Sequence, residues 1–186
     1  IKKMYTNIPI FFLLFSIEVL CIVMKKNNIT GIATPHDGVS DESFFVIDKN
    51  FKRTGFAVVT PKEMRDIAHF ELEHAYSRLG SKIVTRQIWG VPMGGPLSAP
   101  MARLAVTIME MQFLHQHPSF PTRAQAARYT DDVGFAVFAK NRTLAEKFMR
   151  DTTTQIYHES LQLKRDDDPL DDFSVFVGHL VKKDTF

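Results

Sequence analysis

The sequence of residues 127–138 is Ala-Arg-Tyr-Thr-Asp-Asp-Val-Gly-Phe-Ala-Val-Phe, in which two apolar stretches flank a pair of aspartates. The alternation of side chains after the pair is typical of a β-strand that packs on one face. We therefore predict a β-hairpin with strands at 127–130 and 133–138 and with Asp131 and Asp132 at its tip.

A carboxylate pair at a hairpin tip suits metal-dependent chemistry. Phosphoryl transfer to a 3′-hydroxyl by the two-metal route needs two divalent cations about 3.5–4 Å apart. Magnesium prefers a few carboxylates together with water and phosphate oxygens. An Asp-Asp pair alone is more often a solvated turn. The acidic run at 166–168, with Asp171 and Asp172, is interpreted as such a turn because Pro169 interrupts it and no apolar hairpin flanks it.

A second informative segment, residues 87–100, has the sequence Gln-Ile-Trp-Gly-Val-Pro-Met-Gly-Gly-Pro-Leu-Ser-Ala-Pro. Gly94 and Gly95 allow the backbone to approach a ligand closely. Ser98 at the start of the next helix would place backbone N–H groups and a hydroxyl near an anion or a base. On its own, a loop rich in glycine and proline favours a purely structural role.

In this order along the chain, the two segments closely resemble motifs B and C of reverse transcriptases. Residues 90–98 match motif B, and Arg128-Tyr-Thr-Asp-Asp132 matches motif C. Partial matches to the tail of motif A at 5–9, to motif D at 161–164 and to motif E, the primer grip, at 176–180 follow the family's order. The wording is closest to Penelope-like and other non-retroviral reverse transcriptases, or to organellar ones.

The resemblance implies a right-hand polymerase palm, and residues 1–186 are interpreted as one partial reverse-transcriptase-like palm domain. The order of expected elements predicts an α+β fold, a ferredoxin-like antiparallel sheet with helices on one face. The family's motif A aspartate would fall one position before Ile1, and fingers and thumb lie outside the matched segments. We therefore expect a fragment without complete fingers or thumb that works as part of a longer or split enzyme.

The resemblance also implies roles for individual side chains. At the metal site, Asp131 would bind Mg²⁺ or Mn²⁺ directly and Asp132 would contribute more weakly. Lys164 corresponds to the lysine that protonates the pyrophosphate leaving group, although a solvated surface lysine is the ordinary alternative. The implied nucleotide-binding residues are Tyr5, Gln87, Gly94, Gly95 and Ser98. The implied primer-grip residues are Gly178 and His179.

One implied role has an ordinary alternative, and one residue departs from the family's pattern. Tyr5 would lie under the incoming sugar and exclude a 2′-hydroxyl, or it would simply be a core residue. Arg103 lies in the motif B helix where the family usually has a small polar residue, which is a departure from the pattern.

The composition fits one globular domain, with 186 residues, 45% hydrophobic and 24% charged. The formal net charge of +2 is low for a nucleic-acid binder, so phosphate contacts would depend on local basic patches.

The single cysteine, Cys21, is expected to be a buried thiol. His115 and His117 precede a proline and are interpreted as a helix end, not a metal site. Trp89 could stack on a base or lie in the core.

The most apolar stretch, residues 8–24, is broken by Ser16 and Glu18. A membrane span needs about 20 apolar residues, so we predict a buried helix here and keep membrane association as a weaker alternative. The other expected elements are a loop at 27–43, strands at 44–47, 56–59, 83–90, 161–164 and 173–177, and helices from a Thr60–Glu63 capping box to Gly80, from Ser98 to His117, and from a Thr143–Glu146 capping box onward.

Two functions follow as hypotheses. The first is an RNA-directed DNA polymerase palm, of the kind found in retroelements, that acts on an RNA template and a DNA primer. A further segment or subunit would supply the motif A aspartate, fingers and thumb. The second is an inactive descendant that serves as a structural or RNA-contacting subunit of a ribonucleoprotein such as an organellar ribosome. Either would be intracellular, with a mitochondrial location left open.

Overall fold

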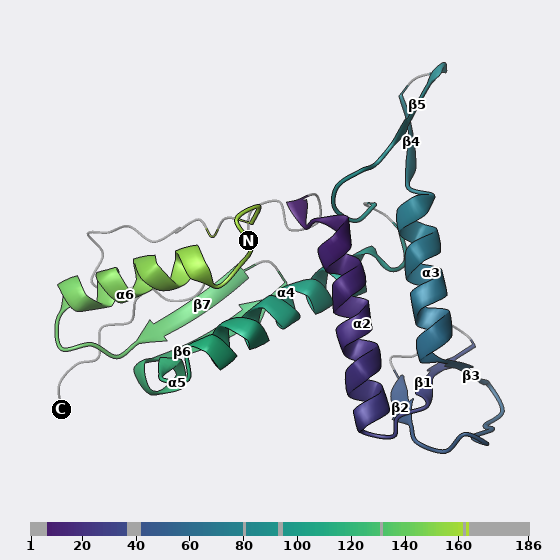
Figure 1. Cartoon of the computed structure of the whole chain (residues 1–186), viewed down its shortest axis with the longest axis horizontal. Helices are drawn as coiled ribbons and strands as arrows, with labels where there is room; N and C mark the ends of the chain where they lie inside the picture. The colour runs from purple at the N-terminus through teal and green to yellow at the C-terminus, as the bar shows by residue number, and fades with distance from the viewer. Residues whose placement is uncertain are drawn as a thin grey trace.

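The computed structural model describes residues 7–36, 42–79, 81–92, 95–130, 132–161 and 163 and shows a mixed α+β chain (Figure 1). The helices are α2 (Ile10–Lys26), α3 (Pro61–Glu73), α4 (Ser98–Gln116), α5 (Phe120–Arg123) and α6 (Arg142–Gln155). The strands are β1 (Gly31–Pro35), β2 (Phe44–Val46), β3 (Phe56–Val59), β4 (Tyr76–Leu79), β5 (Ile83–Arg86), β6 (Ala124–Tyr129) and β7 (Asp132–Val137).

The α+β class is therefore confirmed, although the described strands do not form one sheet. They form three antiparallel sheets: β2-β1-β3, the β4–β5 hairpin and the β6–β7 hairpin. Of the two C-terminal strands expected at 161–164 and 173–177, Leu161 and Leu163 are described and lie outside any strand. The rest of those two segments falls outside the described residues.

Helix α2 forms at the apolar stretch and lies between α3 and the start of α4 (Figure 1). Leu13, Ile17 and Cys21, spaced four residues apart, are buried, as expected for the inward face of a helix. The Ser16 hydroxyl donates to the Phe12 carbonyl at 2.7 Å, so this polar interruption is satisfied inside the helix. Among the described residues, no helix is long and apolar enough to cross a membrane.

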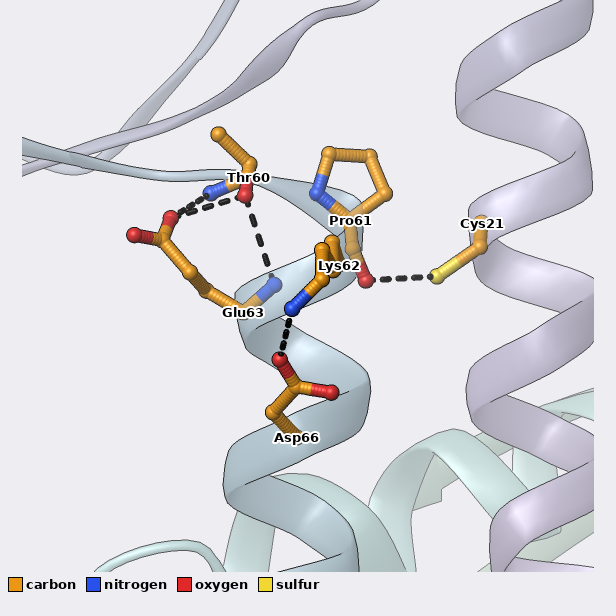
Figure 2. Close-up of polar contacts among 6 residues, drawn as sticks. All are labelled: Cys21, Thr60, Pro61, Lys62, Glu63 and Asp66. Carbon is orange, nitrogen blue, oxygen red and sulfur yellow. Dashed lines mark hydrogen bonds and ion pairs between the residues drawn. The ribbon is translucent and has the colours of Figure 1, made fainter.

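The predicted capping box at the start of α3 is confirmed (Figure 2). The Glu63 N–H donates to the Thr60 hydroxyl at 3.3 Å, and the Thr60 N–H donates to the Glu63 carboxylate at 2.8 Å. The Thr60 backbone bond also lowers the pKa of the Glu63 carboxyl. Nearby, the Cys21 thiol donates to the Pro61 carbonyl at 3.5 Å, which links α2 to the first turn of α3.

The expected end of this helix was wrong. Helix α3 stops at Glu73, and Tyr76, predicted to be helical, begins β4. The imidazole of His74 stacks on the ring of Phe70 with centroids 4.4 Å apart at the helix end. Beyond it the backbone pairs with β5, with Tyr76 opposite Arg86, and this non-local pairing overrides the local helical pattern.

Strand β1 was also missed, since residues 27–43 were expected to be a loop. Gly31–Pro35 pairs with both β2 and β3 and is the central strand of its sheet. At Gly31 a Cβ would lie 2.6 Å from Val58 Cγ1 and 2.9 Å from the Val59 carbonyl oxygen. Glycine is therefore required at this position for the close approach of β3, although the sequence predicts a loop here.

Helix α6 begins earlier than predicted. Its N-cap is Asn141, whose side chain accepts from the Leu144 N–H at 2.9 Å, and no Thr143–Glu146 capping box forms. Glu146 instead accepts from Arg142 at 3.0 Å. Asparagine is at least as favourable an N-cap as threonine, which allows the helix to begin at this earlier residue.

The β6–β7 hairpin forms as predicted and contributes one face to the main core. Val133, Phe135 and Val137 are buried in alternation along β7. They belong to one cluster with the buried faces of α2, α4 and α6, and β7 lies between α4 and α6 (Figure 1). The core thus fixes the position of the hairpin that carries the aspartate pair.

Candidate functional site

The tip of the β6–β7 hairpin is a two-residue turn. Tyr129 pairs with Asp132, which leaves Thr130 and residue 131 between the strands. Asp132, the first residue of β7, is exposed, and Tyr129 is 82% exposed. The tip therefore presents the Asp132 carboxylate to solvent, as the sequence predicted.

Thr130 has a φ of 55°, in the left-handed region. A β-branched residue rarely adopts this conformation, which costs about 1–3 kcal/mol. The hairpin turns that match the twist of two strands do require positive φ. The turn that carries the carboxylates is thus strained, and such strain persists only where the surrounding structure imposes it.

The surrounding structure is a set of hydrogen bonds made by Arg128 on β6. Its Nε donates to Glu110 Oε1 at 2.7 Å and its Nη2 donates to the Thr107 hydroxyl at 2.8 Å, both on α4. Its Nη1 donates to the carbonyl of Thr130 at 3.2 Å. One guanidinium therefore joins the strained turn to the helix beneath it.

The Arg128–Glu110 ion pair is mostly buried, with side chains 16% and 23% exposed. The Tyr157 hydroxyl, just after α6, donates to the same Glu110 oxygen at 2.7 Å. Burial, and then the neighbouring Glu110 carboxylate, raises the pKa of the Tyr157 phenol, so this group stays a proton donor. We call Thr107, Glu110, Arg128 and Tyr157 the anchor network.

Part of this network could be predicted from the sequence. Arg128 belongs to the motif C match, and Glu110 lies in the helix that follows motif B. Thr107 precedes Glu110 by three residues, and this spacing places both side chains on one helix face. Thr107 could therefore have been predicted as a neighbour of Glu110. Tyr157 had no local signal, because its role depends on how the chain returns after α6.

Segments that resemble three different motifs also meet. The Asn7 side chain donates to the Ser160 carbonyl at 3.2 Å, and the Gly90 N–H donates to the Ile8 carbonyl at 3.0 Å. Ile8 and Leu161 are buried in the same cluster as β7. The end of the motif A match therefore contacts the start of the motif B match and the residue before the motif D match.

The glycine loop is held by its own polar groups. The Gly95 N–H donates to the Pro92 carbonyl at 3.1 Å, and the Ser98 N–H donates to the Gly95 carbonyl at 3.1 Å. The Ser98 hydroxyl also donates to the Pro92 carbonyl, so Ser98 does not cap α4. Instead α4 begins after Leu97 without a side-chain cap, and the expectation of a capping serine was wrong.

The packing around position 95 requires a glycine there, whether or not the loop binds a ligand. A Cβ there would lie 2.5 Å from Glu71 Oε1 and 2.9 Å from Ser98 Oγ. The loop thus rests against the Glu71 side chain from α3. Glu71 Oε2 is buried and has no hydrogen-bond partner among the described residues.

Gln87 is engaged within the same region. Its side-chain amide donates to the Trp89 carbonyl at 2.6 Å and to the Val91 carbonyl at 2.9 Å. Trp89 itself is 53% exposed, so the core alternative for this residue was wrong. An exposed indole remains able to stack on a base.

Comparison with protein-family models, with curated proteins and with solved structures finds no match to this chain. What is known of the site is its own geometry.

That geometry covers part of the predicted site. Gln87, Gly95, Ser98 and Asp132 are described. Gln87 donates to the Val91 carbonyl, and Gly95 and Ser98 both donate to the Pro92 carbonyl, so the first three bond to adjacent residues of one segment. Six predicted residues lie outside the described residues: Tyr5, Gly94, Asp131, Lys164, Gly178 and His179. Among the residues that are described, no three His, Cys, Asp or Glu side chains converge on a metal position. Asp132 supplies one oxygen donor of the kind that Mg²⁺ or Mn²⁺ binds, which is a partial set.

A groove of about 910 Å³ lies away from the hairpin tip, between α2, the start of α3 and the β2–β3 connection. Cys21 and the ion-paired Arg65 line it. Burial raises the pKa of the Cys21 thiol, which disfavours the thiolate needed by a nucleophile or a metal ligand.

Proposed function

We propose that this chain is the palm of a reverse-transcriptase-like RNA-directed DNA polymerase that works as part of a longer or split enzyme. The observation that carries the proposal is the anchored aspartate hairpin. Asp132 is exposed at a strained tip, and Arg128 ties that tip to the helix that follows the glycine loop. A scaffold that holds Asp132 and the adjacent turn in a fixed place suits chemistry that depends on metal positions.

The chemistry would be two-metal nucleotidyl transfer, in which Mg²⁺ or Mn²⁺ activates the primer 3′-hydroxyl and stabilises the departing pyrophosphate. Asp131 and Asp132 are the residues of this chain proposed to hold the ions, with a third carboxylate supplied from elsewhere in the enzyme. Arg128 would position both aspartates, because it bonds to the carbonyl of Thr130, the residue that joins β6 to them. The loop from Gln87 to Ser98 would form the wall against which the new base pair rests.

The substrates in this proposal are an RNA template, a DNA primer and deoxynucleotides. Lys164 is the proposed proton donor to the leaving group, and Gly178 and His179 are the proposed support for the primer. Tyr5 is proposed to select against a 2′-hydroxyl. These four assignments rest on the resemblance of the sequence alone.

The proposal is tested by primer extension with the native enzyme carrying Asp132→Asn. The variant removes a charge from an exposed tip residue and leaves its shape, so the fold should be retained while extension falls strongly. Asp151→Asn, at an exposed position of α6, is the matched control and should extend at the wild-type rate. Equal rates for the Asp132→Asn variant and wild type would remove Asp132 from the mechanism.

A second function is favoured by the anchor network itself. Its four side chains satisfy one another and stabilise the hairpin whether or not the tip binds a metal. The chain could therefore serve as an inactive structural or RNA-contacting subunit of a ribonucleoprotein, such as an organellar ribosome. In that case association with the particle survives Asp131→Ala combined with Asp132→Ala, and its loss in the double variant would count against this function.

A further inference from the structure

The β4–β5 hairpin extends from the end of α3 away from the helices (Figure 1). All four residues of β5 are exposed, with Ile83 at 57% and Val84 at 67%. Within the part of the chain that is described, β4 and β5 pair only with each other. A lone two-stranded ribbon is marginally stable in water, so a partner that covers this one would stabilise it.

One face of this ribbon combines an aromatic ring with cations. Tyr76 lies opposite Arg86, and Arg78 lies opposite Val84, so the four residues share a face. Tyr76 is 59% exposed. Arg78 also donates to the Ser81 carbonyl at 2.8 Å, which holds its guanidinium near the turn of the hairpin.

The ribbon lies in a segment without acidic residues. From residue 74 to residue 109 there is no Asp or Glu, while Arg78, Lys82, Arg86 and Arg103 are basic. The ion pairs among the described residues involve other side chains, so Lys82 and Arg86 present uncompensated charge. For a chain with a net charge of only +2, this is a strong local concentration of positive charge.

A second exposed aromatic follows the ribbon. The backbone N–H of Gln87 donates to the Ala75 carbonyl at 2.8 Å and extends the ladder to the base of the hairpin. Trp89 and Ile88 come next and are 53% and 72% exposed. Cations interleaved with exposed rings are the combination that binds unpaired nucleotides, because phosphates meet the cations and bases stack on the rings.

We propose that the β4–β5 ribbon, with Trp89 at its base, is a docking surface for single-stranded nucleic acid. Lys82 and Arg86 contact backbone phosphates, and Tyr76 and Trp89 stack on bases. The rings favour a single strand over a duplex, whose bases are already stacked on one another. The inference goes beyond the proposed function, because it needs neither the aspartate pair nor synthesis.

The test is binding of a fluorescein-labelled oligouridylate of about 16 nucleotides to the full native protein in EDTA, measured by anisotropy. Lys82→Glu with Arg86→Glu should weaken binding about tenfold or more, and should reduce the slope of log K against log salt by about 1.4, or about 0.7 per phosphate contact. Tyr76→Ala and Trp89→Ala should each weaken binding by about 5-fold to 100-fold.

The matched control is Lys140→Glu with Lys147→Glu, which makes the same charge change at exposed positions beside and within α6. It should leave the affinity within about twofold of wild type, because α6 lies at the opposite end of the molecule from the ribbon (Figure 1) and interactions beyond a Debye length of about 10 Å are largely screened. Trp89 is the only tryptophan, so its fluorescence in the wild-type protein reports stacking without any substitution. Binding should quench it.

Three results would overturn the inference: no binding or no quenching in the wild-type protein, equal weakening by the Lys140/Lys147 control, or tight duplex binding that Tyr76→Ala and Trp89→Ala leave unchanged. The Asp131→Ala, Asp132→Ala double variant should bind the oligonucleotide like wild type. In the wild-type native protein, by contrast, oligonucleotide binding without any primer extension would contradict the polymerase proposal alone and leave the docking surface standing.

Discussion

The β4–β5 and β6–β7 hairpins differ in almost everything except their antiparallel pairing. One side of β7 is buried in the main core and the tip of its hairpin is anchored by Arg128, whereas every residue of β5 is exposed. The β6–β7 hairpin presents an acidic tip in a fixed place. The β4–β5 hairpin presents cations and rings on a surface that no other described element covers. Burial determines which hairpin can position a group, and exposure determines which one can adapt to a ligand.

The largest expected difference between the hairpins is in stability on losing an aromatic ring. Phe135→Ala should lower the free energy of unfolding by about 3–5 kcal/mol, because the ring is 3% exposed in the core. Tyr76→Ala, the matched change on the exposed ribbon, should cost less than about 0.5 kcal/mol. Urea unfolding measures both. Similar losses for the two variants would mean that the ribbon is packed in solution.

The second largest expected difference between the two hairpins is in the stability lost when an arginine is removed. Arg128→Ala leaves Glu110 in a mostly buried position without its cation and should cost about 2–4 kcal/mol. Arg86→Ala removes an exposed side chain and should cost less than about 0.5 kcal/mol. A double-mutant cycle between Arg128 and Glu110 gives their coupling energy. A coupling near zero would show that the ion pair does not support the turn.

Tyr157→Phe should cost about 1.5–3 kcal/mol near neutral pH, because the lost hydrogen bond goes to a charged acceptor. The pH dependence has a definite sign. Since the folded state raises the pKa of this phenol above its ordinary value of 10.0, the wild-type advantage is complete below about pH 10 and declines as pH rises further. Unfolding of both proteins between neutral pH and pH 11 (about one unit above that value) checks this. An advantage that grows with pH would refute it.

The smallest expected effect is at the strained turn. Thr130→Asn should raise stability by about 0.5–1 kcal/mol, because asparagine adopts the left-handed region with less strain than threonine. If the strain serves to aim the aspartates, primer extension by the native enzyme should fall even though the fold is more stable. Thermal unfolding and extension rates on the same preparation separate the two effects. A variant that is less stable than wild type would show that Thr130 is not strained.

Local signals predicted the local features of this fold. The capping box at Thr60, the strand at Phe56–Val59 and the hairpin around the aspartates each depend on residues within a few positions of one another. Strand β1 was missed because its identity comes from pairing with β2 and β3, and Gly31 is explained only by contact with Val58.

The candidate site shows the same division. The exposed position of Asp132 followed from alternation along the strand, whereas Tyr157 donates to Glu110 across 47 positions and could not be inferred locally. Ser98 was expected to cap a helix because serine usually does so, but Leu97 takes the N-cap position, Ser98 is the first helical residue, and its hydroxyl donates to the Pro92 carbonyl. The roles implied for Asp131, Lys164 and His179 stay predictions.

The most direct test of the central claim is DNA synthesis on an RNA template by the protein purified with its native partners, with and without Asp131→Ala. We predict primer extension that requires Mg²⁺ or Mn²⁺ and that disappears in the variant, while circular dichroism and oligonucleotide binding are unchanged. Extension that persists in the Asp131→Ala enzyme would contradict the assignment of this hairpin as the catalytic centre of a polymerase palm.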